Sequence, residues 1–453
     1  LSQSLLVLAS PFLTRLYTPE DFGVFGVYIS IFSVLAVGAS LSYQQAIPLP
    51  QADDDAANLL ALSLAMTLVT SLLAGLGVAL WSEQIVRWAS APGLEPYLRL
   101  LPLSVLGAGA FQALNYWMAR KQRFGVLSYT KSLRTLGQVG AQVALGIFRL
   151  DAIGLVVGHV ASQFLGMFTL WRRSYLPRRA LDWRRWHTLA KTHKKFPLFT
   201  VWTSLINVIG LYAPSVLFAR YFTLDTAGFF SQTMRVLGLP AGLIGQAVAQ
   251  VFYPKAARHE GQASMTRKLV EQVATSLLVV SFIVFSVVAP LGSDLFAWAF
   301  GQDWGIAGRY SQYLAPWFMI SFVSSPLSSF ALVKGRQRGN LIYGCFLTVS
   351  RLGAIWLGNW YNSADFSVLS FSVVNVLFYL AYVAWILRLA GSSLIGWLGS
   401  IKEFVLLSIP LLAGLFGLKS LLPPLISVLV SGVSVGSFGL WFWLRGRGSF
   451  ARE

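Results

Sequence analysis

Four basic side chains fall inside long apolar segments of this sequence: Lys131, Arg134, Arg235 and Arg351. A charge within membrane hydrocarbon costs roughly 3 kcal/mol or more, so such residues normally face a cavity or a partner. A guanidinium stays protonated and holds phosphate groups with paired hydrogen bonds. The three arginines therefore predict a cationic cavity that binds a phosphate-bearing anion. Lys131 lies near a loop, and snorkelling to the surface is the favoured interpretation there.

Two further arginines, Arg15 and Arg220, lie at equivalent ends of two apolar segments. They are candidates for the same anion site, with a structural role at the helix ends as the alternative. Ion pairing within a helix bundle is the alternative for the arginines inside the segments.

Uncharged amides recur in pairs with helical spacing. Gln138 and Gln142 lie four residues apart, as do Gln246 and Gln250, which puts each pair on one helical face. Such faces can line a wet cavity and hydrogen-bond the hydroxyls of a sugar. Hydrogen bonding between helices, worth ~0.6 kcal/mol for each bond, is an equally good interpretation of these pairs.

Residues that could carry enzyme chemistry are scarce. For His159, the one titratable candidate well inside a segment, packing is the favoured role. Asp53, Asp54 and Asp55 have the D-x-D spacing of some metal-binding glycosyltransferases, but nothing nearby resembles a nucleotide-binding domain, so a solvated loop is favoured. The single cysteine, Cys345, excludes an internal disulfide and a cysteine-based metal site. We expect no catalytic residue, no metal and no cofactor, and no ATP hydrolysis by this chain.

The elements that must position these residues are transmembrane helices. Of 453 residues, 56% are hydrophobic and 11% are charged, whereas soluble domains carry about 25% charged residues. Leu1 begins inside an apolar stretch with no basic region before it, so we expect no cleavable signal peptide and a first helix that lacks its start. Apolar stretches of about 20 residues indicate membrane spans. Fourteen are predicted, at residues 1–16, 22–48, 58–81, 97–119, 124–149, 152–171, 197–219, 228–252, 269–291, 310–333, 340–358, 366–388, 404–420 and 422–444.

The net charge of +18 reflects loop composition and gives no indication of nucleic-acid binding. Lys and Arg concentrate in alternate loops, nine of them within 172–196, which places those loops in the cytoplasm by the positive-inside rule. The chain is therefore predicted to be a multi-pass protein of the inner (plasma) membrane. Residues 181–196, with Trp183 and Trp186 among the bases, predict an amphipathic stretch on the inner leaflet, in contact with membrane lipids.

The chain also repeats itself. RLYTPEDFGVF at 15–25 is echoed by RYFTLDTAGFF at 220–230, with an offset of 205, and Gln122-Arg123 is echoed by Gln337-Arg338. An offset of six helices preserves topology, so the repeat is parallel, as in two-lobed transporters. The predicted fold is all-α, with two six-helix lobes and two extra helices. The predicted domains are an N-lobe at 1–171, a basic connector at 172–196, a C-lobe at 197–388 and two further helices with a basic tail at 389–453.

Two segments carry a family resemblance. SPFLTRLYTPEDFGVFGVY at 10–28 and SYQQAIPLP at 42–50 resemble the opening of Wzx-type O-antigen and polysaccharide flippases. These belong to the multidrug/oligosaccharidyl-lipid/polysaccharide exporter superfamily. Family members often carry a charge near the second segment, where this chain has the uncharged Gln44 and Gln45.

The resemblance implies a flippase for undecaprenyl-pyrophosphate-linked oligosaccharide repeat units of O-antigen, capsule or exopolysaccharide. The units would move from the inner to the outer leaflet by alternating access, with polysaccharide polymerase and chain-length machinery as candidate partners. A multidrug exporter of the same superfamily is an alternative, disfavoured because cationic drugs prefer acidic cavities. A membrane polymerase or ligase is less favoured, because such enzymes usually need a long external loop with catalytic residues.

Overall fold

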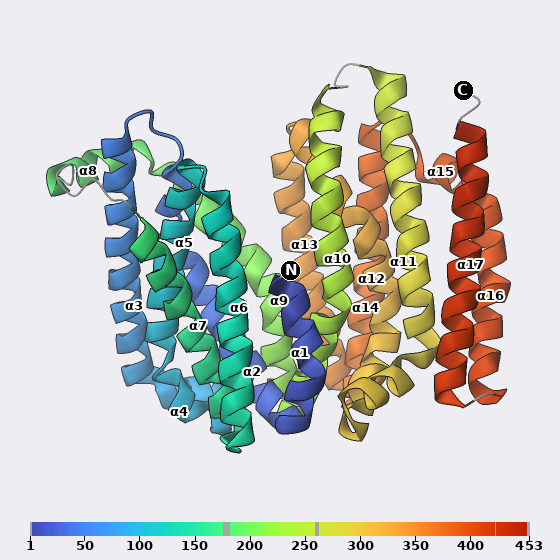
Figure 1. The fold of residues 1–453 in the computed structure, drawn as a ribbon, viewed down its shortest axis with the longest axis horizontal. Coiled ribbons are helices and arrows are strands. Elements are labelled where there is room, and N and C mark those ends of the chain that lie inside the picture. Colours follow the sequence, from blue (N-terminus) through green and yellow to red (C-terminus); the bar gives the residue numbers. More distant parts are fainter. Residues whose placement is uncertain (1, 175–181, 259–261, 422, 451–453) are drawn as a thin grey trace. The chain divides into compact units, whose positions relative to one another are not determined.

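The computed structural model describes residues 2–174, 182–258, 262–421 and 423–450. Part of the predicted connector, with Arg178 and Arg179, lies outside these ranges, as does Arg452 of the tail. The chain divides into two compact units, residues 1–231 and 232–453, and each is described by itself. Within the described ranges the chain is helical, and fourteen of its helices have 15 residues or more (Figure 1).

The first unit contains seven long helices joined by short turns. The long helices are α1 Ser2–Leu16, α2 Pro19–Gly38, α3 Asp53–Ala89, α5 Leu101–Arg120, α6 Phe124–Ile147, α7 Asp151–Arg173 and α9 Val201–Tyr221. Between them lie the short helices η1 Tyr43–Ala46, η2 Pro92–Leu94, α4 Glu95–Leu98, α8 Trp183–Thr192 and η4 Phe196–Thr200.

The second unit contains most of α10 and all later helices. They are α10 Leu224–Arg258, α11 Ala263–Phe300, η5 Gln302–Trp304, α12 Gly305–Val333, α13 Gln337–Trp360, α14 Ala364–Leu389, α15 Leu394–Ser400, α16 Lys402–Leu421 and α17 Pro424–Phe450. The first two turns of α10 belong to the first unit, so this helix runs from one unit into the other.

Nine helical segments in the described ranges are long and apolar enough to cross a membrane, or eleven if two bent helix pairs each count as one span. The predicted all-helical membrane fold is thus confirmed. Among the boundaries that differ, the helix expected over 22–48 ends at Gly38, because Leu41 and Ser42 adopt left-handed backbone conformations (φ 51° and 60°) that a helix cannot continue through. The expected break before Pro424 is present.

The sequence repeat has a shared local structure. Thr18 caps α2: its Oγ1 accepts from the Asp21 amide at 3.2 Å, and Asp21 Oδ2 accepts from the Thr18 amide at 2.9 Å. At the equivalent position before α10, Thr223 Oγ1 accepts from the Thr226 amide at 3.1 Å. Both copies of the motif therefore start a helix by satisfying its first free amides.

The starts of α2 and α10 also touch each other reciprocally. A Cβ added to Gly23 would overlap the carbonyl oxygen of Leu224, and one added to Gly228 would overlap that of Pro19. Pro19 and Leu224 are themselves 205 residues apart, as are the two glycines. The two repeats thus meet backbone to backbone at matching positions, and glycine is needed at both for the close approach.

Tyr17 follows the end of α1 and fixes its position. Its side chain is buried, and its hydroxyl donates to the Gln142 carbonyl on α6 at 2.6 Å. Gly146 leaves room for the ring on α6, since a Cβ there would lie 2.9 Å from it, and Gly154 does the same on α7. Tyr17 therefore holds the end of α1 against the α6–α7 pair.

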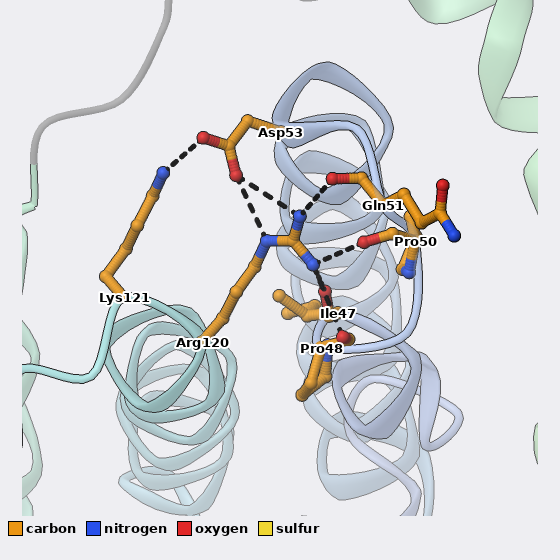
Figure 2. A network of polar contacts seen from close by, with 7 residues as sticks. All are labelled: Ile47, Pro48, Pro50, Gln51, Asp53, Arg120 and Lys121. Atoms are coloured by element: carbon orange, nitrogen blue, oxygen red, sulfur yellow. Dashed lines mark hydrogen bonds and ion pairs between the residues drawn. The ribbon is translucent and has the colours of Figure 1, made fainter.

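Arg120, at the end of α5, fixes the segment that carries the second family motif. It donates to four backbone carbonyls, those of Ile47 (3.4 Å), Pro48 (3.3 Å), Pro50 (2.6 Å) and Gln51 (3.1 Å) (Figure 2). It also contacts Asp53 Oδ1 at 3.2 Å, while Lys121 Nζ contacts Asp53 Oδ2 at 2.5 Å. Asp53 is thus held by two cations at the start of α3, which gives it a structural role.

Arg120→Ala should destabilise the first unit by about 1–3 kcal/mol, because it leaves several carbonyls without their donor. Lys121→Ala removes one exposed ion pair with the same Asp53 and should change stability little. Thermal unfolding in detergent would compare the two variants. Equal stability losses would contradict the importance of the carbonyl contacts.

Candidate functional site

Arg351 is the most deeply buried of the arginines predicted from the sequence. It lies on α13, and its residue is 7% exposed. Its Nε donates to Asn375 Oδ1 at 2.7 Å, and its Nη2 lies 3.4 Å from the Tyr379 hydroxyl, both on α14. Asn375 Nδ2 donates to the Phe371 carbonyl at 2.7 Å, which turns the amide oxygen toward the arginine. The asparagine therefore orients the guanidinium without neutralising it.

Aromatic rings surround the same guanidinium. Its Cζ lies 5.3 Å from the ring centre of Trp317 on α12, 5.8 Å from that of Phe371 and 5.9 Å from that of Tyr379. Aromatic faces attract a cation, most strongly where water is excluded. The Trp317 side chain is 3% exposed, and its indole N–H has no hydrogen-bond partner among the described residues. Buried N–H donors normally have a hydrogen-bond partner. An anion beside Arg351 would supply one for this indole.

Arg134 occupies a comparable place in the first unit. It lies on α6, half-buried, with its Cζ 4.7 Å from the ring centre of Phe111 on α5. On the other side it packs against α7, where a Cβ added to Gly166 would lie 3.1 Å from Arg134 Cδ. In the part of the chain that the structure describes, no carboxylate or hydrogen-bond acceptor pairs with this guanidinium. It is a cation held by apolar surroundings.

The two arginines share a local design. Each lies on the middle helix of three consecutive ones, α5–α6–α7 for Arg134 and α12–α13–α14 for Arg351. Each has an aromatic ring from the preceding helix, Phe111 or Trp317, over its guanidinium. The likeness of the two arginines therefore extends to their neighbours.

Gly166→Ala should lower transport severalfold while leaving the charge of Arg134 in place. The new methyl group would lie 2.9 Å from the Phe111 ring and 3.1 Å from Arg134 Cδ, so the arginine side chain must shift. Overpacking of this kind costs about 1–3 kcal/mol. Gly140→Ala on α6 is the matched control, because a Cβ there meets nothing within 4 Å. Wild-type transport by Gly166→Ala would show that the position of Arg134 is unimportant.

The remaining predicted arginines lie in different surroundings. Arg235 is half-buried on α10. Arg15 is exposed in the last turn of α1, and Arg220, exposed in the last turn of α9, donates to Ser90 Oγ at 2.9 Å. A cation at a helix C-terminus is favoured by the helix dipole, so Arg15 and Arg220 have a structural role available. Their part in substrate binding stays a prediction, as does that of Arg235.

The two glutamine pairs differ in exposure. Gln246 and Gln250 are both exposed on α10. An exposed amide within a membrane-spanning helix is costly in lipid. This cost favours contact with water for the face of α10 that carries the two glutamines. Gln142 is buried, and its Nε2 donates to the Leu155 carbonyl on α7 at 2.9 Å, while Ser162 Oγ lies 3.5 Å from Gln138 Oε1. In this structure the Gln138/Gln142 pair therefore makes hydrogen bonds between helices.

His159 has the surroundings of a packing residue. It is buried, its Nε2 lies 3.0 Å from Gln163 Nε2, and its ring contacts Phe32 edge to face with centres 4.9 Å apart.

The sequence predicts Arg351 and Arg134 as candidates but not the residues around them. Trp317 is one of 16 tryptophans in a chain rich in aromatic residues, so nothing in its type marks it. In the sequence Arg120 is one of the basic residues between two apolar segments, because contacts to backbone carbonyls leave no trace in the spacing of side chains.

Helices of this length and apolarity, with Arg351 buried in one unit and Arg134 half-buried in the other, are typical of a multi-pass membrane transporter. The chain belongs to the polysaccharide biosynthesis protein family, which it matches over residues 12–307. It is a multi-pass transporter of the bacterial inner membrane, not an enzyme, and its family serves polysaccharide biosynthesis. The predicted family resemblance is thereby confirmed.

Similar proteins agree with this assignment. The chain is 24% identical to the succinoglycan biosynthesis transport protein ExoT of Rhizobium meliloti (strain 1021), over 94% of this chain and 86% of that one. It is 20% identical to the lipopolysaccharide biosynthesis protein WzxC of Escherichia coli (strain K12), over 73% and 68%. Its fold is similar to that of the lipid II flippase MurJ in an inward closed conformation, with a TM-score of 0.78, 13% identity and coverage of 98% and 97%.

Proposed function

We propose that this protein is a flippase for undecaprenyl-pyrophosphate-linked oligosaccharide repeat units of O-antigen, capsule or exopolysaccharide. It would carry them from the inner to the outer leaflet by alternating access. The observation that carries the proposal is Arg351, a buried guanidinium held by a neutral amide beside an indole N–H with no partner among the described residues. The names of similar proteins, a lipid II flippase among them, support the same class of substrate.

The chemistry of the cargo explains why such arginines would be needed. A lipid pyrophosphate carries its charge on two phosphates, which must leave water when they cross the bilayer. A guanidinium binds phosphate through two parallel hydrogen bonds and keeps its proton in a dry environment. Arg351 and Arg134 supply one such group in each unit. The exposed amides Gln246 and Gln250 would hydrogen-bond sugar hydroxyls. Polymerase and chain-length machinery would use the flipped units.

The direct test is flipping of a fluorescent lipid-pyrophosphate oligosaccharide in proteoliposomes. The protein should flip this lipid and should leave a matched neutral glycolipid without pyrophosphate in place. Empty liposomes are the background control. Equal flipping of both lipids would remove the anion-binding role, and an absence of flipping by folded protein would remove the function.

A cationic-drug assay distinguishes the flippase from the alternative, a multidrug exporter. Overexpression should leave susceptibility to cationic drugs unchanged, because both the buried Arg351 and the half-buried Arg134 are positive and would repel a cation. Increased resistance would support the exporter in place of the flippase.

A further inference from the structure

The short helix α8 is held against the first unit by its start. The backbone amide of Asp182 and the indole N–H of Trp186 donate to Asn58 Oδ1 on α3, at 2.9 and 3.3 Å. Arg185 Nη1 lies 3.5 Å from Asp55 Oδ1. Figure 1 shows α8 crosswise to α3, beside the end of α3 that carries these residues. This is the end that the distribution of Lys and Arg assigns to the cytoplasm.

One face of α8 packs on the core of the first unit. Trp186, Leu189 and Ala190 recur at helical spacing and pack against a buried cluster that includes Trp117 and Met118 of α5. The Tyr43 hydroxyl lies 3.5 Å from the Ala190 carbonyl. The apolar side of the helix is therefore covered by protein.

The opposite face is basic and exposed. It presents Trp183, which is 74% exposed, together with the exposed residues Arg184, His187, Lys191, Lys194 and Lys195. Arg184 Cζ lies 5.9 Å from the Trp183 ring centre. The one acid in 182–195 is Asp182, which lies at the helix start and contacts Arg185. A row of cations beside an exposed tryptophan is typical of a helix at the membrane interface.

We propose that this basic face of α8, Trp183, Arg184, Lys191, Lys194 and Lys195, binds the headgroups of anionic phospholipids in the inner leaflet. The cations are exposed and spread along the helix and the turn after it, which suits many singly charged phosphates. They do not converge on one point, as they would to hold a single pyrophosphate. The contacts to Asn58 and Asp55 couple this lipid contact to the start of α3. The inference stands independently of the proposed function.

Hydrogen exchange tests the proposal on the whole protein in nanodiscs. Amides of residues 183–195 should exchange at least threefold more slowly in discs containing phosphatidylglycerol than in phosphatidylcholine discs, and high salt should remove the difference because it screens the charges. A variant with Arg184, Lys191, Lys194 and Lys195 all changed to Gln should lose it. Arg336→Gln/Arg338→Gln, which removes exposed arginines before and at the start of α13, should keep it.

The outcomes separate the possible ligands. Equal exchange of wild-type residues 183–195 in the two lipids would overturn the proposal. Protection by a few per cent of undecaprenyl pyrophosphate in phosphatidylcholine discs, without protection by phosphatidylglycerol, would also overturn it and assign the face to the transported lipid. Unchanged thermal unfolding of the fourfold variant would show that loss of protection is not loss of fold. None of these measurements requires transport.

Discussion

Replacing Arg351 with methionine should lower the flipping rate roughly 10- to 150-fold, because a hydrogen bond to a charged group is worth about 1.5–3 kcal/mol. Arg351→Lys should restore little of the activity. An ammonium has no planar fork, so it cannot keep the Asn375 contact and also offer two parallel donors to a phosphate. The measurement is flipping of the pyrophosphate-linked lipid in proteoliposomes. Arg336→Gln, which removes an exposed arginine before α13, is the control.

A second variant separates loss of the cation from loss of fold. Asn375→Asp places a carboxylate where Asn375 Oδ1 now accepts from Arg351 Nε at 2.7 Å. The added carboxylate neutralises the charge of Arg351, so the thermal midpoint should be kept or raised, whereas transport should fall as in Arg351→Met. Wild-type flipping by Asn375→Asp would mean that the net positive charge of this site is not used.

The sequence could predict the arginine of this site because charge inside an apolar segment is rare and costly. It could not predict the partners of Arg351. Asn375 lies on the next helix, and a change in the register of α13 against α14 would bring another residue to the same place. Trp317 lies on α12, the helix that precedes α13 in the chain. Such contacts depend on how three helices pack, and apolar segments alone do not specify packing.

The glutamine pairs show a second limit of prediction from the sequence, namely which face of a helix meets a neighbouring helix. Helical spacing correctly puts Gln138 with Gln142 on one side of a helix and Gln246 with Gln250 on one side of another. It does not tell which side meets a neighbouring helix. In the structure Gln142 is buried against α7 and Gln246 is exposed. The repeat at 15–25 and 220–230 is more informative, because the residues that its offset of 205 relates make equivalent, reciprocal contacts in the fold.

Gly23→Ala and Gly228→Ala should each destabilise the protein by about 1–3 kcal/mol, because the added methyl group overlaps a backbone carbonyl that cannot turn aside. Gly26→Ala on the same helix should cost less. Its Cβ would meet the Ser231 hydroxyl at 2.5 Å, and a side chain can rotate away. Gly38→Ala, where a Cβ meets nothing within 4 Å, is the control and should be neutral.

Thermal unfolding in detergent across this series distinguishes a tight backbone contact from ordinary helix packing. The expected order of loss is Gly23 and Gly228, then Gly26, then Gly38. A neutral Gly23→Ala would mean that the two helices move apart at little cost. The matching glycines of the two repeats, Gly23 and Gly228, would then need an explanation other than close approach of the helices.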